Sequence, residues 1–173
     1  MSETVRPVFS ADEIASRVRE LGAAIRADAG RAEVFLLGVL KGTALFTSDL
    51  LRAIEGDVSY AFIDVVRDIS DSETADAVEI DFLSFHDIRA RNVYLLKDVV
   101  ATGVIENYLL TQLRTHEPAS LKLVALLDRP NARTVDLNAD FRAFTIEQDG
   151  TWAGYGLEQR SRFGNLPYIG RAG

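Results

Sequence analysis

A short corner between an acidic residue and a helical pattern is the first feature of this sequence that could do chemistry. The apolar run that begins at residue 92 stops at Asp98, passes through Ala-Thr-Gly at 101–103, and gives way to helical spacing. A tight loop before a helix offers free backbone N–H groups and the positive end of the helix dipole, which suits a phosphate. An ordinary turn between a strand and a helix also carries such a glycine. The phosphate interpretation predicts a cradle at Thr102, Gly103, Val104 and Ile105.

A second candidate anion site follows the apolar run at 34–40, where Lys41 and Gly42 lead into another helical pattern. A lysine at the carboxyl end of a buried parallel strand lies where open α/β sheets bind their ligands. Lys41 is therefore a candidate anion contact. A solvated loop charge is the alternative interpretation of the same lysine.

The elements that must position these loops alternate along the chain. A capping box at Ser10 and Glu13 starts a helical pattern that ends near Gly30. Apolar runs of strand length occur at 34–40, 58–66, 92–98, 121–127 and 141–146, and helical spacing returns at 45–54 and 105–113. Strands that alternate with helices predict an α/β domain with a mostly parallel sheet. Without an internal repeat or a linker, residues 1–173 are expected to form one domain.

The composition limits the classes of partner. The chain has 173 residues, a net charge of −7 and scattered lysines and arginines, which argues against a nucleic-acid partner held through its phosphates. It has no cysteine, which excludes disulfides, thiolate metal sites and a cysteine nucleophile. Its start lacks the apolar core of a signal peptide, and no run approaches the ~20 apolar residues of a membrane span. We therefore expect a cytoplasmic protein with no membrane partner.

Five segments in chain order, between residues 7 and 170, resemble the type I phosphoribosyltransferases and, among them, the hypoxanthine-guanine branch. They match its N-terminal helix (7–22), pyrophosphate loop (38–42), phosphoribosyl-diphosphate motif (98–103), base-recognition turn (126–130) and C-terminal hood (154–158 and 165–170). The resemblance implies a parallel sheet flanked by helices, with a small C-terminal hood. It also implies transfer of ribose 5-phosphate from a diphosphate donor to a purine nitrogen, with Mg²⁺. The protein would act by positioning the reactants and stabilising charge.

The phosphoribosyl-diphosphate motif departs from the family pattern at several positions. The family has two adjacent acids that hold the ribose hydroxyls, whereas this chain has Lys97 followed by Asp98. Ala101 stands where the family has an aspartate that exchanges a proton with the purine N7, and alanine has no proton-accepting group. Ile105 stands where the family has a hydroxyl residue that binds the 5-phosphate. Glu106 follows it, and we expect its carboxylate to repel a phosphate.

The base and diphosphate ends of the implied site also differ. Arg129 stands where the family has a lysine that reads the purine, and its planar guanidinium suits a paired O6/N7 edge. Thr151 stands where the family has an aromatic residue that stacks on the base, and Trp152 beside it is a candidate substitute. Glu158 replaces an aspartate linked to the metal, and Gly164 replaces an arginine that reaches the pyrophosphate.

Three functions remain open on this basis. The favoured hypothesis is a diverged protein that binds a phosphorylated or nucleotide-like small ligand and has lost or altered purine transfer. The alternatives are an active purine phosphoribosyltransferase that uses Asp98 and Lys41, and changed chemistry on another acceptor. We also expect a homodimer or larger homo-oligomer, because Leu45, Phe46, Leu50 and the tail at 167–169 exceed what one sheet must cover.

Overall fold

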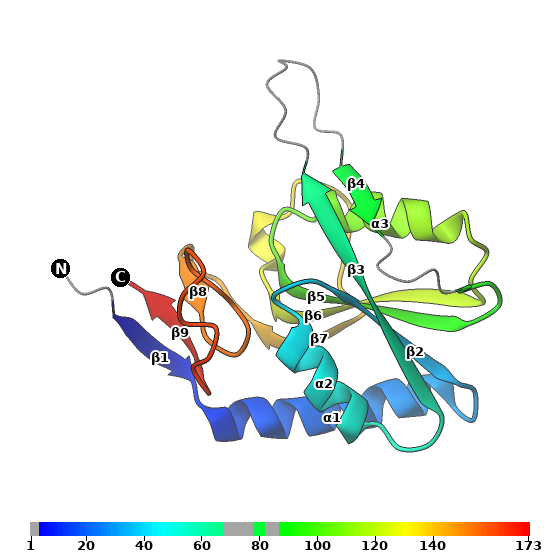
Figure 1. Ribbon diagram of the computed structural model, residues 1–173, viewed down its shortest axis with the longest axis horizontal. Coiled ribbons are helices and arrows are strands. Elements are labelled where there is room, and N and C mark those ends of the chain that lie inside the picture. The colour runs from blue at the N-terminus through cyan, green and yellow to red at the C-terminus, as the bar shows by residue number, and fades with distance from the viewer. Residues whose placement is uncertain (1–3, 68–77, 82–86) are drawn as a thin grey trace, which may run out of the picture.

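The computed structural model describes residues 4–67, 78–81 and 87–173 (Figure 1). The polar, acidic segment at 67–77, which the sequence suggests as either a lid or a plain exposed loop, lies outside the described residues except for Arg67, which ends β3. In chain order the elements are β1 (Val5–Phe9), α1 (Ala11–Ala29), β2 (Val34–Val39), α2 (Ala44–Ala53), β3 (Val58–Arg67), β4 (Val78–Asp81), β5 (Asn92–Val100), α3 (Val104–Arg114), β6 (Ser120–Asp128), η1 (Pro130–Ala132), β7 (Phe141–Thr145), β8 (Thr151–Ala153) and β9 (Ile169–Ala172).

The larger sheet confirms the predicted fold class. Its strand order is β4-β3-β2-β5-β6-β7, and the five strands from β3 to β7 in this order pair in parallel. The segment at 77–85, which the sequence allows as a short strand or hairpin arm, contains β4, and β4 pairs antiparallel with the end of β3. Parallel pairing brings the carboxyl ends of β2, β5 and β6 to one edge. The loops at 40–43, 101–103 and 129–133 therefore leave the sheet side by side.

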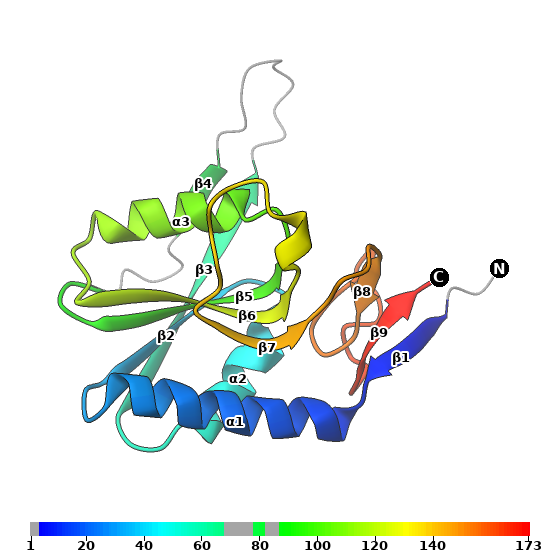
Figure 2. The ribbon, with the colours of Figure 1, turned by 180° about the vertical axis from the view of Figure 1, so that it is seen from behind.

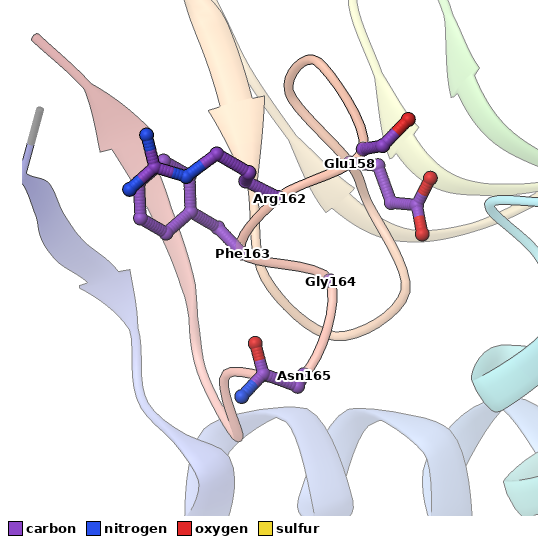
Figure 3. A pocket seen from close by; sticks show the side chains of 6 residues that line it. Glu158, Arg162, Phe163, Gly164 and Asn165 are labelled. Carbon is purple, nitrogen blue, oxygen red and sulfur yellow. The ribbon is translucent and has the colours of Figure 1, made fainter.

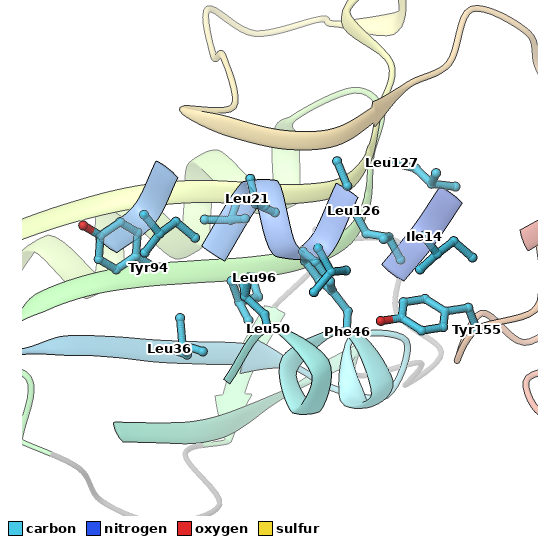
Figure 4. Close-up of a cluster of buried hydrophobic side chains, with 14 of the residues drawn as sticks. Ile14, Leu21, Leu36, Phe46, Leu50, Tyr94, Leu96, Leu126, Leu127 and Tyr155 are labelled. Atoms are coloured by element: carbon cyan, nitrogen blue, oxygen red, sulfur yellow. The ribbon is translucent and has the colours of Figure 1, made fainter. Parts of the chain in front are cut away.

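Helices cover both faces of this sheet, with α1 and α2 on one face and α3 on the other (Figures 1 and 2). The α1 and α2 face buries a cluster that includes Leu36, Phe46 and Leu126 (Figure 4). The α3 face buries a second cluster that includes Leu95 and Leu109. Because both faces are covered, β2 is buried along all six of its residues, as the continuous apolar run predicts.

The hood is a separate small sheet with the order β1-β9-β8 (Figure 1). It joins the two chain ends, since Val5 pairs with Ala172. The capping box connects the hood to α1, because the Ser10 hydroxyl accepts from the Glu13 N–H at 3.3 Å and the Glu13 carboxylate accepts from the Ser10 N–H at 2.8 Å. The predicted helix start is therefore confirmed.

The apolar residues used to predict a homo-oligomer lie mostly inside the single chain. Phe46, Leu50 and Ile169 are fully buried in the cluster under α1 and α2, whereas Leu45 is exposed. These three residues therefore expose no apolar surface that a second copy could cover, and the use of them to predict an oligomer was wrong. In the part of the chain that the structure describes, no helix combines the length and the apolar character that crossing a bilayer requires.

Candidate functional site

The loop after β2 is closed by a buried hydroxyl. Thr43 is fully buried, and its Oγ1 donates to the Val39 carbonyl at 2.7 Å. The Ala44 N–H donates to the Lys41 carbonyl at 3.0 Å, which completes a tight turn into α2. This turn leaves the Lys41 side chain exposed at the carboxyl edge of the sheet, where the sequence predicts an anion contact.

Gly42 brings three of the predicted segments together. A Cβ at Gly42 would lie 2.1 Å from Oδ2 of Asp98, so the Asp98 carboxylate lies directly against this glycine. A Cβ at Gly156 would lie 2.9 Å from the Gly42 carbonyl oxygen, so the hood also approaches the same loop. The close approach of all three segments requires glycine at both positions.

Asp98 is engaged by groups of its own strand. Its Oδ1 accepts from the Val99 N–H at 2.8 Å and pairs with the Lys97 ammonium. The same ammonium lies 4.0 Å from Oε1 of Glu106. One cation therefore serves two carboxylates at the end of β5.

Glu106 points inward from the first turn of α3. The residue is only 4% exposed, and Lys97 is its ion-pair partner. Burial raises the pKa of the Glu106 carboxyl above its ordinary value, and the Lys97 charge opposes this rise. The expectation that Glu106 faces and repels a phosphate is therefore wrong, because its charge is turned into the protein and balanced there.

The loop before α3 forms the helix start at which the sequence predicts an anion cradle. Gly103 adopts φ +82° and is the N-cap of the helix, and the Thr102 hydroxyl accepts from the Val104 N–H at 3.4 Å. Ile105 follows within the first turn, where backbone N–H groups have no intrahelical carbonyl partner. The Thr102 carbonyl accepts from the Thr134 N–H at 3.0 Å, which fixes the loop from the other side.

The Arg133 guanidinium binds backbone carbonyls at the start of this loop. Its Nη1 donates to the carbonyls of Val100 at 2.9 Å and Ala101 at 2.5 Å, and its Nη2 pairs with the buried Asp128. The sequence interpretation missed Arg133. The available signal was an arginine five residues after an acid at the end of a buried strand, which is where backbone carbonyls need donors.

The base-recognition turn places Arg129 beside a surface acid. The Arg129 N–H donates to the Val100 carbonyl at 2.9 Å, and the guanidinium pairs with Asp149, whose side chain is 84% exposed. The Nε of Arg129 is buried and has no protein acceptor among the described residues. Arg129 therefore adjoins the phosphate loop and retains an unused donor.

Trp152 does not share a direction with Thr151. Its ring stacks 6.1 Å from the Phe9 ring, and Phe9 stacks 4.1 Å from Phe144. Successive residues of a strand point to opposite faces, so Thr151 faces away from this aromatic group. The geometry gives no support to Trp152 as a substitute for a stacking aromatic at position 151.

The hood carries a hollow of about 440 Å³ around Glu158 (Figure 3). A Cβ at Gly164 would lie 3.0 Å from Cγ of Glu158, so the longer acid fills space next to the glycine. The Arg162 guanidinium lies 4.8 Å above the Phe163 ring, on the side away from Glu158 (Figure 3). Position 164 therefore lacks the arginine, and a side chain there would have to displace that of Glu158.

Comparison with known proteins agrees with this arrangement. The phosphoribosyl transferase domain family matches residues 8–160. The chain is 33% identical to the hypoxanthine-guanine phosphoribosyltransferase of Bacillus subtilis over 165 residues, which cover 94% of this chain and 90% of that protein. The chain belongs to the phosphoribosyltransferase family.

Solved structures place this phosphoribosyltransferase in the hypoxanthine-guanine branch. A crystal structure of the Bacillus anthracis hypoxanthine-guanine phosphoribosyltransferase has a TM-score of 0.86 at 30% identity and covers 99% of this chain and 100% of that chain. A Trypanosoma cruzi hypoxanthine phosphoribosyl transferase, described for the role of its C-terminal region in oligomeric state and activity, has a TM-score of 0.85 at 30% identity. It covers 96% of this chain and 90% of that one.

The buried acid of this phosphoribosyltransferase predicts a pH effect on stability. An acid whose pKa is higher in the folded state loses stabilising free energy as pH rises from its unfolded pKa. We expect the free energy of unfolding of the wild type, relative to Glu106→Gln, to fall as pH rises above 4.5, the ordinary value. Urea denaturation at several pH values measures this difference, and a difference that does not change with pH contradicts the prediction.

Proposed function

We propose that this phosphoribosyltransferase makes purine nucleoside monophosphates by transferring ribose 5-phosphate from a diphosphate donor to a purine base. The observation that carries the proposal is the meeting of Gly42, Asp98 and Gly156, since it joins the diphosphate loop, the ribose acid and the hood around one edge of the sheet. The relatives at about one-third identity, named as hypoxanthine-guanine enzymes, support the same activity.

We assign roles from placement at this edge. Thr102, Gly103 and the N–H groups of Val104 and Ile105 would bind the 5-phosphate, because N–H groups at a helix start have no intrahelical carbonyl partner and stabilise an anion. Asp98 would accept from a ribose hydroxyl.

The remaining assignments concern the leaving diphosphate and the entering purine base. Lys41 and Gly42 would lie along the diphosphate, since both follow β2 at the same edge. Arg129 would donate to the 6-oxo group and N7 of a purine once its guanidinium exchanges the exposed Asp149 carboxylate for the base. Glu158 would face the diphosphate end from the hood, where the hollow at Gly164 opens.

Magnesium at the proposed site would be held mainly by the substrate, since Mg²⁺ usually takes only one or two protein carboxylates besides phosphate oxygens and water. Among the described residues, no three histidines or acids are grouped as metal ligands. Asp98 is already paired with Lys97, and Glu158 stands on an exposed hood loop. Magnesium enters this proposal only as the counter-ion of the diphosphate substrate.

A second candidate function is nucleotide binding without transfer. Ala101 favours it, because a methyl group cannot exchange a proton with a purine nitrogen. The two candidates differ in one result, since a binding protein would hold IMP or GMP without forming either from base and donor.

A glycine variant tests the phosphate cradle directly. Gly103→Ala is expected to weaken IMP binding by roughly tenfold or more, because a Cβ would lie 3.0 Å from Val135 while φ stays at +82°. Gly30→Ala is a matched control, since Gly30 also has positive φ but its added Cβ meets nothing within 4 Å. Isothermal titration of both variants with IMP measures the effect. Equal IMP affinity in Gly103→Ala and wild type would show that the phosphate of IMP does not bind in this loop.

We also propose that the protein is a homo-oligomer. Leu45 and Tyr60 expose apolar side chains, 44% and 50% respectively, which a second copy would cover. Light scattering that gives a 19.1 kDa particle at every concentration would reject this proposal.

A further inference from the structure

Lys97 and Asp98 are adjacent at the end of β5 and form an ion pair. The alternation of side chains along the strand breaks here, because Leu95 and Val100 both pack under α3 while Leu96 and Val99 both pack under α1 and α2. The Lys97 side chain contacts the Asp98 carboxylate and lies 4.0 Å from Glu106. The ammonium therefore lies at the carboxyl end of the strand, between acids from two elements.

The side chains of Lys97 and Glu106 are both largely buried where they meet. The side chains of Lys97 and Glu106 are 17% and 5% exposed. Glu106 comes from the turn of α3 that also carries the N–H groups of the phosphate cradle, so it fixes the ammonium beside that cradle. Glu106 thus acts as a positioning residue for Lys97.

The ammonium changes what Asp98 can bind. One Asp98 oxygen accepts from the Val99 N–H and pairs with Lys97, and the other lies against Gly42. A divalent cation prefers free carboxylate oxygens and would be repelled by a cation already held there. An ammonium with three donors, by contrast, donates to oxygen acceptors of a bound phosphorylated pentose.

We propose that Lys97 is the resident cation of the ribose end of this site, positioned by Glu106, and that a phosphorylated pentose is held there without a divalent metal at Asp98. The identity of the ligand rests on the proposed function. The state of Asp98 does not, because it follows from the ion pairs alone.

A metal titration without ligand tests the state of Asp98. Mn²⁺ is titrated into the full chain and followed by electron paramagnetic resonance. Wild type is expected to show no Mn²⁺ site, and Lys97→Gln, which frees Asp98 and Glu106, is expected to bind Mn²⁺ at least about tenfold more tightly. Lys122→Met is the matched control, because it frees Asp28 from a similar ion pair at the other end of the sheet. Wild type that binds Mn²⁺ as tightly as Lys97→Gln overturns the proposal.

A second measurement uses IMP in the presence of Mg²⁺ and of a chelator. The dissociation constant of wild type is expected to agree within about twofold between the two buffers, while Lys97→Gln loses about tenfold in the chelator and recovers with Mg²⁺. A tenfold dependence on Mg²⁺ in wild type contradicts the proposal. Absence of IMP binding in both buffers would count against the proposed function, and the Mn²⁺ titration would still decide the role of Lys97.

Discussion

An Ala101→Asp variant, combined with Ile105→Thr, is expected to raise the rate of hypoxanthine or guanine transfer by about 10²–10⁴-fold. The aspartate would supply a proton acceptor between Val100 and the phosphate cradle, and the threonine would supply a hydroxyl in the first turn of α3. Ala101 belongs to neither core cluster, whereas Ile105 is partly buried and packs against the cluster under α3. Ile105→Thr alone is therefore the control for any fall in melting temperature, which Ala101→Asp should not add to.

Asparagine at the same position separates proton transfer from shape. Ala101→Asn with Ile105→Thr has nearly the same size as the aspartate variant, but its amide does not accept a proton near neutral pH. We expect a steady-state assay of nucleoside monophosphate formation to show the increase with aspartate and not with asparagine. Equal rates in the two variants would show that the missing proton acceptor does not limit transfer.

The structure also changes how a fuller restoration must be designed. Lys97→Glu alone would place a second carboxylate beside buried Glu106, where like charges are costly. A double change, Lys97→Glu with Glu106→Leu, avoids this repulsion. These two positions touch the same ion pair, so their effects should not add.

Arg133→Met is expected to lower the free energy of unfolding by up to about 3–5 kcal/mol, the usual cost of an uncompensated buried acid, because only the more exposed Arg142 would still pair with Asp128. Asp128 is 1% exposed and pairs with the Arg133 Nη2 group. The same guanidinium donates to the carbonyls of Val100, Ala101 and Leu137, so its loss also leaves backbone acceptors unpaired.

Arg142→Met provides the comparison for this effect. Arg142 also pairs with Asp128, at 3.1 Å, but its side chain is 39% exposed and Arg133 remains in place without it. We expect a loss of about 1 kcal/mol or less for an ion pair that stays open to water. Urea unfolding of both variants measures the difference, and similar losses would contradict the central place given to Arg133.

The fold was predictable because local patterns and packing agree. The continuous apolar run of β2 predicts a strand covered on both faces, and the capping box at Ser10 fixes the start of α1. The pattern at 77–85 allowed a short strand or a hairpin arm, and β4 within it pairs antiparallel with β3, but which neighbour it pairs with depends on tertiary contact and not on local spacing. Phe46 was expected at a surface for the same reason, since only packing decides which side of a helix is covered.

The site was predictable to the level of loops but not of side-chain partners. Thr102, Gly103 and Asp98 could be placed at one edge, because parallel strands bring their carboxyl ends together. The ion pair of Lys97 with Glu106 joins two elements across the loop, so no sequence period reports it. The direction of Trp152 depended on the register of β8, which a three-residue strand does not reveal.

Wild-type turnover with hypoxanthine and with guanine, the phosphoribosyl diphosphate donor and Mg²⁺ tests the account most directly. Chromatography of the products should show IMP or GMP forming faster than in a protein-free mixture, with a rate that rises in the Ala101→Asp, Ile105→Thr variant. If neither protein forms IMP or GMP from either base, the account of this chain as a purine phosphoribosyltransferase is contradicted.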